Sequence, residues 1–239
     1  MMRRKYFNII FLGLVITISS LFSDKGIQLI KSMTEAESRN ITIVLDAGHG
    51  GFDPGKIGVN KALEKDINLS IAHKLKRLLE EKDIKVIMTR EDDNGLYNAT
   101  DRDKKSVDMR KRASIINSSD ALFAVSIHQN SFSQESSRGA QVFYHQNSTE
   151  GKLIAETIQE RMKQSLNDGN HRLAKANGSY YMLRNTKCPL VIVECGFLSN
   201  WKEASLLIDD TYQEKIASAI GQGIMEYIDN VRSGRDSLR

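Results

Sequence analysis

The stretch VLDAGHGGFDPGKIG, residues 44–58, indicates the fold of this chain. It continues an apolar run that begins at Ile41, stops at Asp46 and leads into a turn where His49 stands among five glycines. A short apolar run bounded by glycines is typical of a buried strand, and glycines let the backbone turn and another group approach closely. The stretch therefore predicts a buried strand that places one histidine at its end.

Strand-like and helix-like segments alternate along the rest of the chain. Apolar runs predict strands at 41–46, 84–90, 121–128, 139–145, 180–185 and 190–197. Helical spacing of apolar residues predicts helices at 63–82, 107–120, 148–166, 201–209 and 211–229. The charged segment 91–106 is expected to be a loop. This order predicts a single-domain α/β fold, with a twisted, mostly parallel sheet flanked by helices on both faces.

The N-terminus has the features of an export segment. Basic residues at 3–5 precede an apolar run at 6–22, which is near the lower limit of about 17–25 residues for a membrane span. We expect the protein to be exported and to work outside the cytoplasmic membrane, either secreted or anchored. The expected organisation is a signal peptide or membrane anchor at 1–23, a connector at 24–40, a globular domain at 41–230 and a polar tail at 231–239.

Charge and cysteine content exclude some classes of function. Three of the four net positive charges lie at residues 3–5, and charges of both signs are interspersed elsewhere, which argues against a nucleic-acid partner. The two cysteines, Cys188 and Cys195, form no CxxC pair, which excludes a cysteine-ligated zinc site. A bridge between them stays open, but a reduced, buried Cys195 fits its apolar surroundings better.

Four side chains with possible chemistry lie near the ends of predicted strands or at the start of a helix. His49 and His128 each follow an apolar run, and each taken alone is more often a structural histidine. Glu64 opens the first long helix, where the helix dipole favours a negative charge. Glu194 directly follows the apolar run 190–193, so it needs a cationic partner or a raised pKa.

Taken together, these four residues match the groups of a zinc hydrolase. Two histidines and one carboxylate, with a position left open for water, form a catalytic zinc site of the His₂Glu type. A second carboxylate near that water serves as general base. We therefore expect His49, Glu64 and His128 to bind zinc and Glu194 to act as the base. Their spacing is not H-E-x-x-H, so the spacing alone does not establish the site.

Five motifs, in this order, resemble the zinc-dependent N-acetylmuramoyl-L-alanine amidases of the Amidase_3 family: DAGHGGFDPGKIG, LEKDINLS, MRKRASIIN, ALFAVSIHQNSF and CPLVIVECGFLSN. The resemblance spans residues 41–229. It implies one zinc ion per chain, bound by His49, Glu64 and His128, with Glu194 as the catalytic glutamate. The short form of the chain is most similar to the sporulation members of the family.

The resemblance also implies a substrate and partners. The substrate is the amide between N-acetylmuramic acid and L-alanine of the peptidoglycan stem peptide. In the sporulation members, its cleavage leads to muramic-δ-lactam in the spore cortex, the mark that germination enzymes read. No wall-binding module is evident, so targeting through the N-terminal membrane segment or an activating protein partner is expected.

Further residues are candidates for substrate contacts. Asn130 lies two residues after His128. Arg184 is a candidate for binding a stem-peptide carboxylate, because a guanidinium group can donate two hydrogen bonds to one carboxylate. Lys56 stands where the family usually has alanine, near the site. Arg112 and Asn117 match a family motif, but a surface salt bridge and a helix cap explain them as well.

Two other functions remain open. A zinc peptidase that cleaves within the stem peptide would use the same metal site. A wall-binding domain without activity is the second alternative, although binding alone would not need Glu194 beside a metal.

Overall fold

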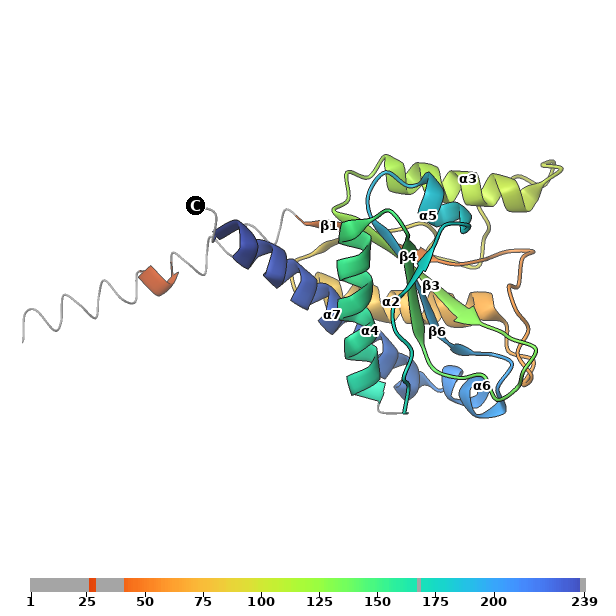
Figure 1. Cartoon of the computed structure of the whole chain (residues 1–239). Coiled ribbons are helices and arrows are strands. Elements are labelled where there is room, and N and C mark those ends of the chain that lie inside the picture. Colours follow the sequence, from red (N-terminus) through yellow and green to blue (C-terminus); the bar gives the residue numbers. More distant parts are fainter. Residues whose placement is uncertain (1–25, 29–40, 167–168, 237–239) are drawn as a thin grey trace, which may run out of the picture. The chain divides into compact units, whose positions relative to one another are not determined.

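The computed structural model of the chain describes residues 26–28, 41–166 and 169–236 (Figure 1). Residues 1–40 and 41–239 form two separate units, and the second holds the folded domain. The predicted signal or anchor at 1–23 lies outside the described residues, as does most of the predicted connector. None of the helices within the described ranges is long and apolar enough to span a bilayer.

In the described part of the chain the strands form one six-stranded sheet, in the order β2-β1-β3-β6-β4-β5. Strands β1 (Thr42–Ala47), β2 (Lys85–Met88), β3 (Phe123–Asn130) and β6 (Leu190–Phe197) run parallel to their neighbours in this group. Strand β4 (Gln141–His145) is antiparallel to β6, and β5 (Lys175–Asn177) is parallel to β4. The prediction of a mostly parallel sheet is therefore confirmed.

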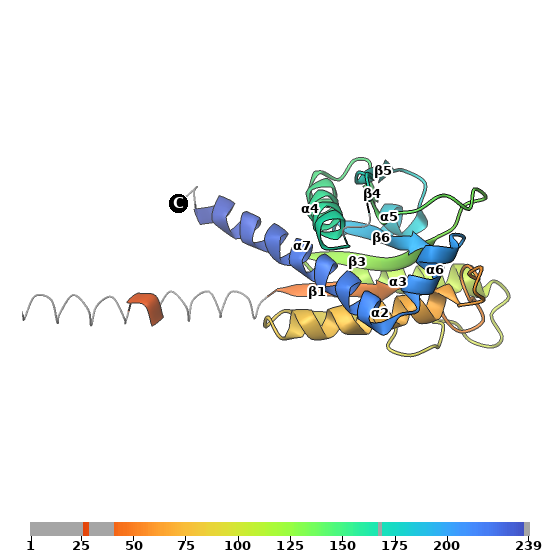
Figure 2. The ribbon, with the colours of Figure 1, turned by 90° about the horizontal axis from the view of Figure 1, so that it is seen from below.

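Helices cover both faces of this sheet, as predicted (Figures 1 and 2). One face is covered by α2 (Glu64–Glu80), α4 (Thr149–Leu166), α6 (Trp201–Leu207) and α7 (Asp210–Asp236). The other is covered by α3 (Lys104–Asn117) and α5 (Tyr181–Asn185). Strand β1 is buried on both faces. Ile43 and Leu45 pack toward α2 and α7, and Val44 packs toward α3.

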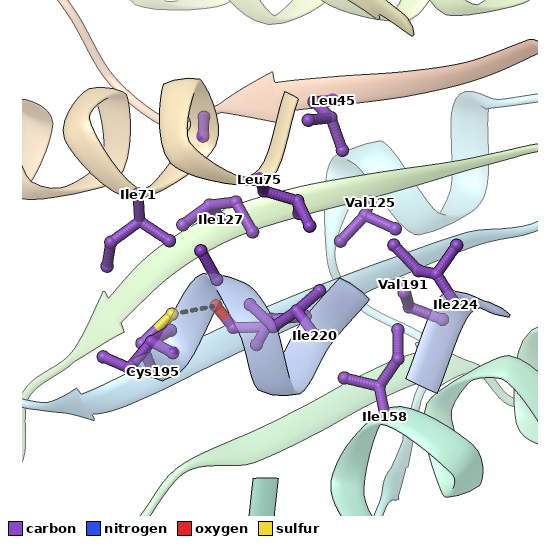
Figure 3. Packing of buried hydrophobic residues seen from close by; sticks show 14 of the residues in the cluster. Leu45, Ile71, Leu75, Val125, Ile127, Ile158, Val191, Cys195, Ile220 and Ile224 are labelled. Atoms are coloured by element: carbon purple, nitrogen blue, oxygen red, sulfur yellow. Dashed lines mark hydrogen bonds between the residues drawn. The ribbon is translucent and has the colours of Figure 1, made fainter. Parts of the chain in front are cut away.

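The larger core lies between the sheet and α2, α4 and α7 (Figure 3). Cys195 of β6 belongs to this core, fully buried, and its thiol donates to the Val193 carbonyl. Neither Cys195 nor Cys188 forms a disulfide in the described chain. The labelled side chains of this core are Leu45, Ile71, Leu75, Val125, Ile127, Ile158, Val191, Cys195, Ile220 and Ile224.

Two elements differ from the sequence prediction. Residues 180–185 were expected to form a strand, but Tyr181–Asn185 is the short helix α5. Adjacent residues Met182 and Leu183 are both buried against the sheet, which a helical turn permits and an alternating strand does not. The three-residue strand β5 was not predicted, because KAN carries no apolar pattern and is defined by its pairing with β4.

Helices α4 and α7 approach closely at Gly223. A Cβ atom at this position would lie 2.6 Å from the Ile158 Cα and 2.9 Å from its backbone nitrogen. Gly221, two residues earlier on α7, has room: the nearest atom to its added Cβ is Leu75 Cδ1 at 3.5 Å. The two glycines of one helix thus have opposite roles in packing.

We expect Gly223→Ala to lower the free energy of unfolding by about 1–3 kcal/mol, because the two helices must move apart. The matched variant Gly221→Ala should instead raise it by up to about 1 kcal/mol, because alanine is the better helix former. Urea unfolding of both variants measures the difference. Equal stability of the two would contradict the close packing of α4 on α7.

Candidate active site

The carboxyl ends of β1, β3 and β6 bring the predicted site residues to one edge of the sheet. His128 of β3 and Glu194 of β6 are direct neighbours in the strand register. His49 follows the end of β1, and Glu64 is the first residue of α2. Ligands gather at this edge in open α/β sheets, so the topology itself places the four side chains together.

The turn after β1 has an unusual backbone. His49 has a φ of 63°, in the left-handed region that few non-glycine residues adopt. A Cβ on the preceding residue, Gly48, would lie 2.2 Å from the His128 ring. The glycine is therefore required for the two histidines to approach, and their ring centroids are 5.0 Å apart with an interplanar angle of 81°.

A buried ion pair lies beneath this turn. Arg112 of α3 donates to Asp46 Oδ1 at 2.8 Å, and Thr89 and Ser126 also donate to this carboxylate. Burial alone would raise the pKa of Asp46, but Arg112 and these hydrogen bonds lower it to about 2. Asp46 is therefore ionised, and its charge is compensated by the guanidinium group.

Arg112 also holds the backbone of the turn. It donates to the carbonyl oxygens of Ala47, at 2.7 Å, and His49. Arg90 donates to the carbonyls of Ala47 and Gly48, at 2.8 and 3.1 Å. Of the two explanations left open for Arg112, the surface salt bridge is wrong, because this side chain is buried against the turn after β1, where it is 3% exposed.

The carboxylate of Glu64 lies between the two histidines. Its Oε1 is 3.2 Å from His49 Nε2 and 3.0 Å from His128 Nδ1, and it also accepts the backbone N–H of Gln129. Its other oxygen accepts the backbone N–H of Lys56 at 2.8 Å. The position of the carboxylate is therefore fixed from several directions.

The charges in this cluster affect one another. Burial alone would raise the pKa of Glu64, but hydrogen bonds and charge from His128 and His49 hold it well below its usual range. Burial alone would lower the pKa of His128, but the Glu64 carboxylate outweighs this effect and raises it. The cluster thus favours an ionised Glu64.

His49 has a second partner on the other side of its ring. Its Nδ1 lies 3.0 Å from Asp53 Oδ2, so Nε2 is left to face Glu64. Asp53 also accepts the backbone N–H of Gly55 at 3.1 Å. The contact sets the orientation of the imidazole and its tautomer. Asp53 was not predicted as a site residue, although it stands only four residues after His49.

Glu194 differs from the other carboxylates. Its Oε2 is buried and has no hydrogen-bond partner among the described residues. Burial and the nearby charge of Glu64 raise its pKa to about 7. A carboxyl group with this pKa can exchange a proton near neutral pH, which a general base requires.

These residues line a cleft of about 360 Å³. Asn130 lines it too, and its side chain accepts the backbone N–H of Ser131. Arg184, the other predicted substrate contact, lies exposed on α5 and is not among the lining residues. The lining residues are His49, Asp53, Gly55, Lys56, Glu64, Lys105, His128, Gln129, Asn130, Ser131, Tyr180 and Glu194.

The donor atoms of His49, Glu64 and His128 fit a zinc ion. They all lie within 4.8 Å of one another. Ligand atoms around a tetrahedral zinc, with bonds of about 2.0–2.2 Å, are separated by about 3.3–3.6 Å. The Glu64 oxygen is close to this distance from a nitrogen of each histidine. The structure therefore brings the three predicted ligands together, and their role as ligands stays a prediction.

Comparison with known families agrees with the geometry. The model of the Amidase_3 family, described as N-acetylmuramoyl-L-alanine amidase, matches residues 43–226. The chain belongs to this family. The resemblance inferred from the five motifs is thereby confirmed, and Amidase_3 membership makes the chain an amidase of peptidoglycan, the material of the cell wall.

Several Amidase_3 relatives are similar over most of the chain. The germination-specific N-acetylmuramoyl-L-alanine amidase of Bacillus subtilis is 39% identical over 188 residues, which cover 77% of this chain and 78% of the relative. The CwlD amidase of Clostridioides difficile, solved in complex with the GerS lipoprotein, is 46% identical with a TM-score of 0.77. That match covers 80% of this chain and 99% of the solved one. The expected similarity to the short members of the family is confirmed.

A more distant relative shares only the Amidase_3 domain with this chain. LytC of Bacillus subtilis, another N-acetylmuramoyl-L-alanine amidase, is 31% identical over 188 residues, which cover 78% of this chain but 35% of LytC. The Amidase_3 domain therefore occurs both in short chains and within much longer ones.

We expect Arg112→Met to lower the free energy of unfolding by about 3–5 kcal/mol, because Asp46 would be left as a buried, unpaired charge. Arg110→Met, at an exposed position of the same helix, should change it by less than about 0.5 kcal/mol. Urea unfolding followed by circular dichroism compares the two. Similar midpoints would show that the Asp46–Arg112 pair does not support the fold.

Proposed function

We propose that this chain is a zinc-dependent N-acetylmuramoyl-L-alanine amidase that hydrolyses the amide between N-acetylmuramic acid and L-alanine. The observation that carries the proposal is the arrangement in one cleft of three zinc-type donors and a fourth, separate carboxylate, Glu194, with an unpaired buried oxygen. His49, Glu64 and His128 would bind the metal, and Glu194 would be the catalytic residue.

The metal and Glu194 would have different roles in the reaction. Bound zinc would supply Lewis acidity and lower the pKa of a ligated water from about 15.7 to about 7. Glu194 accepts a proton from the attacking water and later gives it to the amine of L-alanine as the C–N bond breaks. The products are the free lactyl carboxylate of muramic acid and a stem peptide with a free N-terminus.

The biological setting is proposed from the relatives. One relative is named germination-specific, and CwlD was solved with a lipoprotein. We infer a role in spore cortex maturation, where removal of stem peptides precedes muramic-δ-lactam formation and enables germination. We also propose export through the segment 1–23, either cleaved or retained as an anchor, and activation by a protein partner.

Mass spectrometry of peptidoglycan digested by the full chain, with zinc and with chelator, tests the activity. Stem peptides that begin at L-alanine, released only with metal, are expected. Fragments cut between two amino acids would instead establish a zinc peptidase. Intact muropeptides in the presence of zinc, from a protein with bound zinc, would contradict an amidase that works alone.

Substitution of the proposed base and substitution of a proposed metal ligand should have different effects. Glu194→Ala should keep zinc and lose turnover by at least about 100-fold, the lower end for a general base. His128→Ala should lose both, because a metal ligand is removed. Zinc content by mass spectrometry and peptide release measure the two effects. Full activity of Glu194→Ala would rule out the mechanism.

Asp53 should act on the metal through His49. Partners of metal-bound histidines typically change metal affinity by about 10–100-fold when they are replaced. We expect Asp53→Asn to raise the Kd for zinc by about tenfold, measured by competition with a chelating dye. Asp66→Asn, at an exposed position on α2, is the matched control. A Kd equal to that of the control would show that Asp53 does not orient His49.

A further inference from the structure

Two lysines line the catalytic cleft from different parts of the chain. Lys56 lies in the segment between β1 and α2, and Lys105 lies in the first turn of α3. Both are exposed at their side chains. The segment 91–106 was expected to be a loop, so the position of Lys105 at this cleft was not predicted.

The position of Lys56 is fixed relative to the proposed metal ligands. Its backbone N–H donates to Glu64 Oε2 at 2.8 Å, and its carbonyl accepts the backbone N–H of Glu64. Its ammonium group has no ion pair or hydrogen bond within the described residues. The backbone is therefore held beside the reaction centre while the charge stays available.

The positive charge of Lys105 is only weakly neutralised by neighbouring side chains. In the described chain its one ion pair is with Asp53 Oδ2, at 3.5 Å. That oxygen already contacts His49 Nδ1 at 3.0 Å, and the other oxygen of Asp53 accepts the Gly55 N–H. Lys105 is 60% exposed, so a second anion can reach it from the cleft.

The other acidic groups of the cleft do not compete for these lysines. Glu64 is buried, and its oxygens are used by the two histidines and by backbone N–H groups. Glu194 keeps its Oε2 buried. With a divalent metal bound, the cleft is positive overall and therefore favours an anionic substrate.

The chemistry of the proposed substrate shows where that anion lies. Before cleavage the lactyl carboxyl group is part of the amide, so an unmodified glycan has no charge near the scissile bond. Carboxylates occur only on the peptide side. An ammonium group binds a carboxylate as a compact charge with three donors, and such charge-assisted bonds are the stronger ones.

On the basis of the proposed function, we infer that Lys56 and Lys105 bind a carboxylate of the stem peptide. They make the enzyme selective for peptides with free carboxylates over peptides in which these groups are amidated. This role belongs to the lysines of the cleft rather than to Arg184, which does not line it.

Steady-state kinetics of the zinc-loaded full chain on three soluble muropeptides test the inference. The first has all carboxylates free, the second is amidated on the residue after L-alanine, and the third is amidated at the peptide C-terminus. We expect the wild type to show a KM about threefold to tenfold higher on one of the amidated forms. That form identifies the carboxylate that is bound.

The Lys56→Ala/Lys105→Ala variant should raise KM on the free acid by the same factor, and amidation should then have little further effect. The loss of substrate affinity should raise KM and leave kcat unchanged, because the lysines contact the carboxylate equally in the ground and transition states. Lys111→Ala, at an exposed position of α3, is the matched control. Zinc content must match the wild type, because Lys105 contacts Asp53.

Calorimetric titration of the same muropeptides into a Glu194→Gln chain gives the affinity without turnover. Equal affinity for free and amidated forms, or a lysine variant with the KM of the control, would overturn the inference while the amidase function stands. If the wild type releases no peptide from any of the three, the chain is not an amidase that works alone, and the titration of free and amidated muropeptides then decides the inference.

Discussion

The buried pair of Asp46 and Arg112 is the interaction on which the site depends. The turn after β1 leaves its carbonyl groups pointing under the sheet edge, and Arg112 and Arg90 donate to those of residues 47–49. Two guanidinium groups in one buried place repel each other, and burial together with Arg112 lowers the pKa of Arg90. The Asp46 carboxylate compensates this positive charge, which explains why an acidic residue is buried at the end of an apolar strand.

From this base the arrangement of the cleft follows. The turn holds His49 in a left-handed conformation, Gly48 leaves room for the ring of His128, and Glu64 lies between the two rings. Each feature is supported by hydrogen bonds from the backbone or from a second side chain. The proposed ligands are thus held in place by contacts within the protein itself, which reduces the ordering that metal binding would require.

Much of this could be predicted from sequence, and the limits have physical causes. The strand ends at His49, His128 and Glu194 were visible because apolar runs stop abruptly there, and a parallel sheet brings such ends together. Helix α5 was missed because aromatic residues favour strands, while the packing of Met182 and Leu183 decided the outcome. Arg112, Asp53 and Lys105 act through contacts distant in sequence or through an irregular loop, which local patterns do not encode.

The edges of the sheet have a consequence for how copies of the protein meet. Its central strands are apolar on both faces, and such a sheet could pair with another chain through any long free edge. Here the two outer strands, β2 and β5, are four and three residues long, and each begins with an exposed lysine. A short, charged border offers little backbone for a neighbour to pair with. The sheet can therefore keep an apolar centre without becoming a template for aggregation.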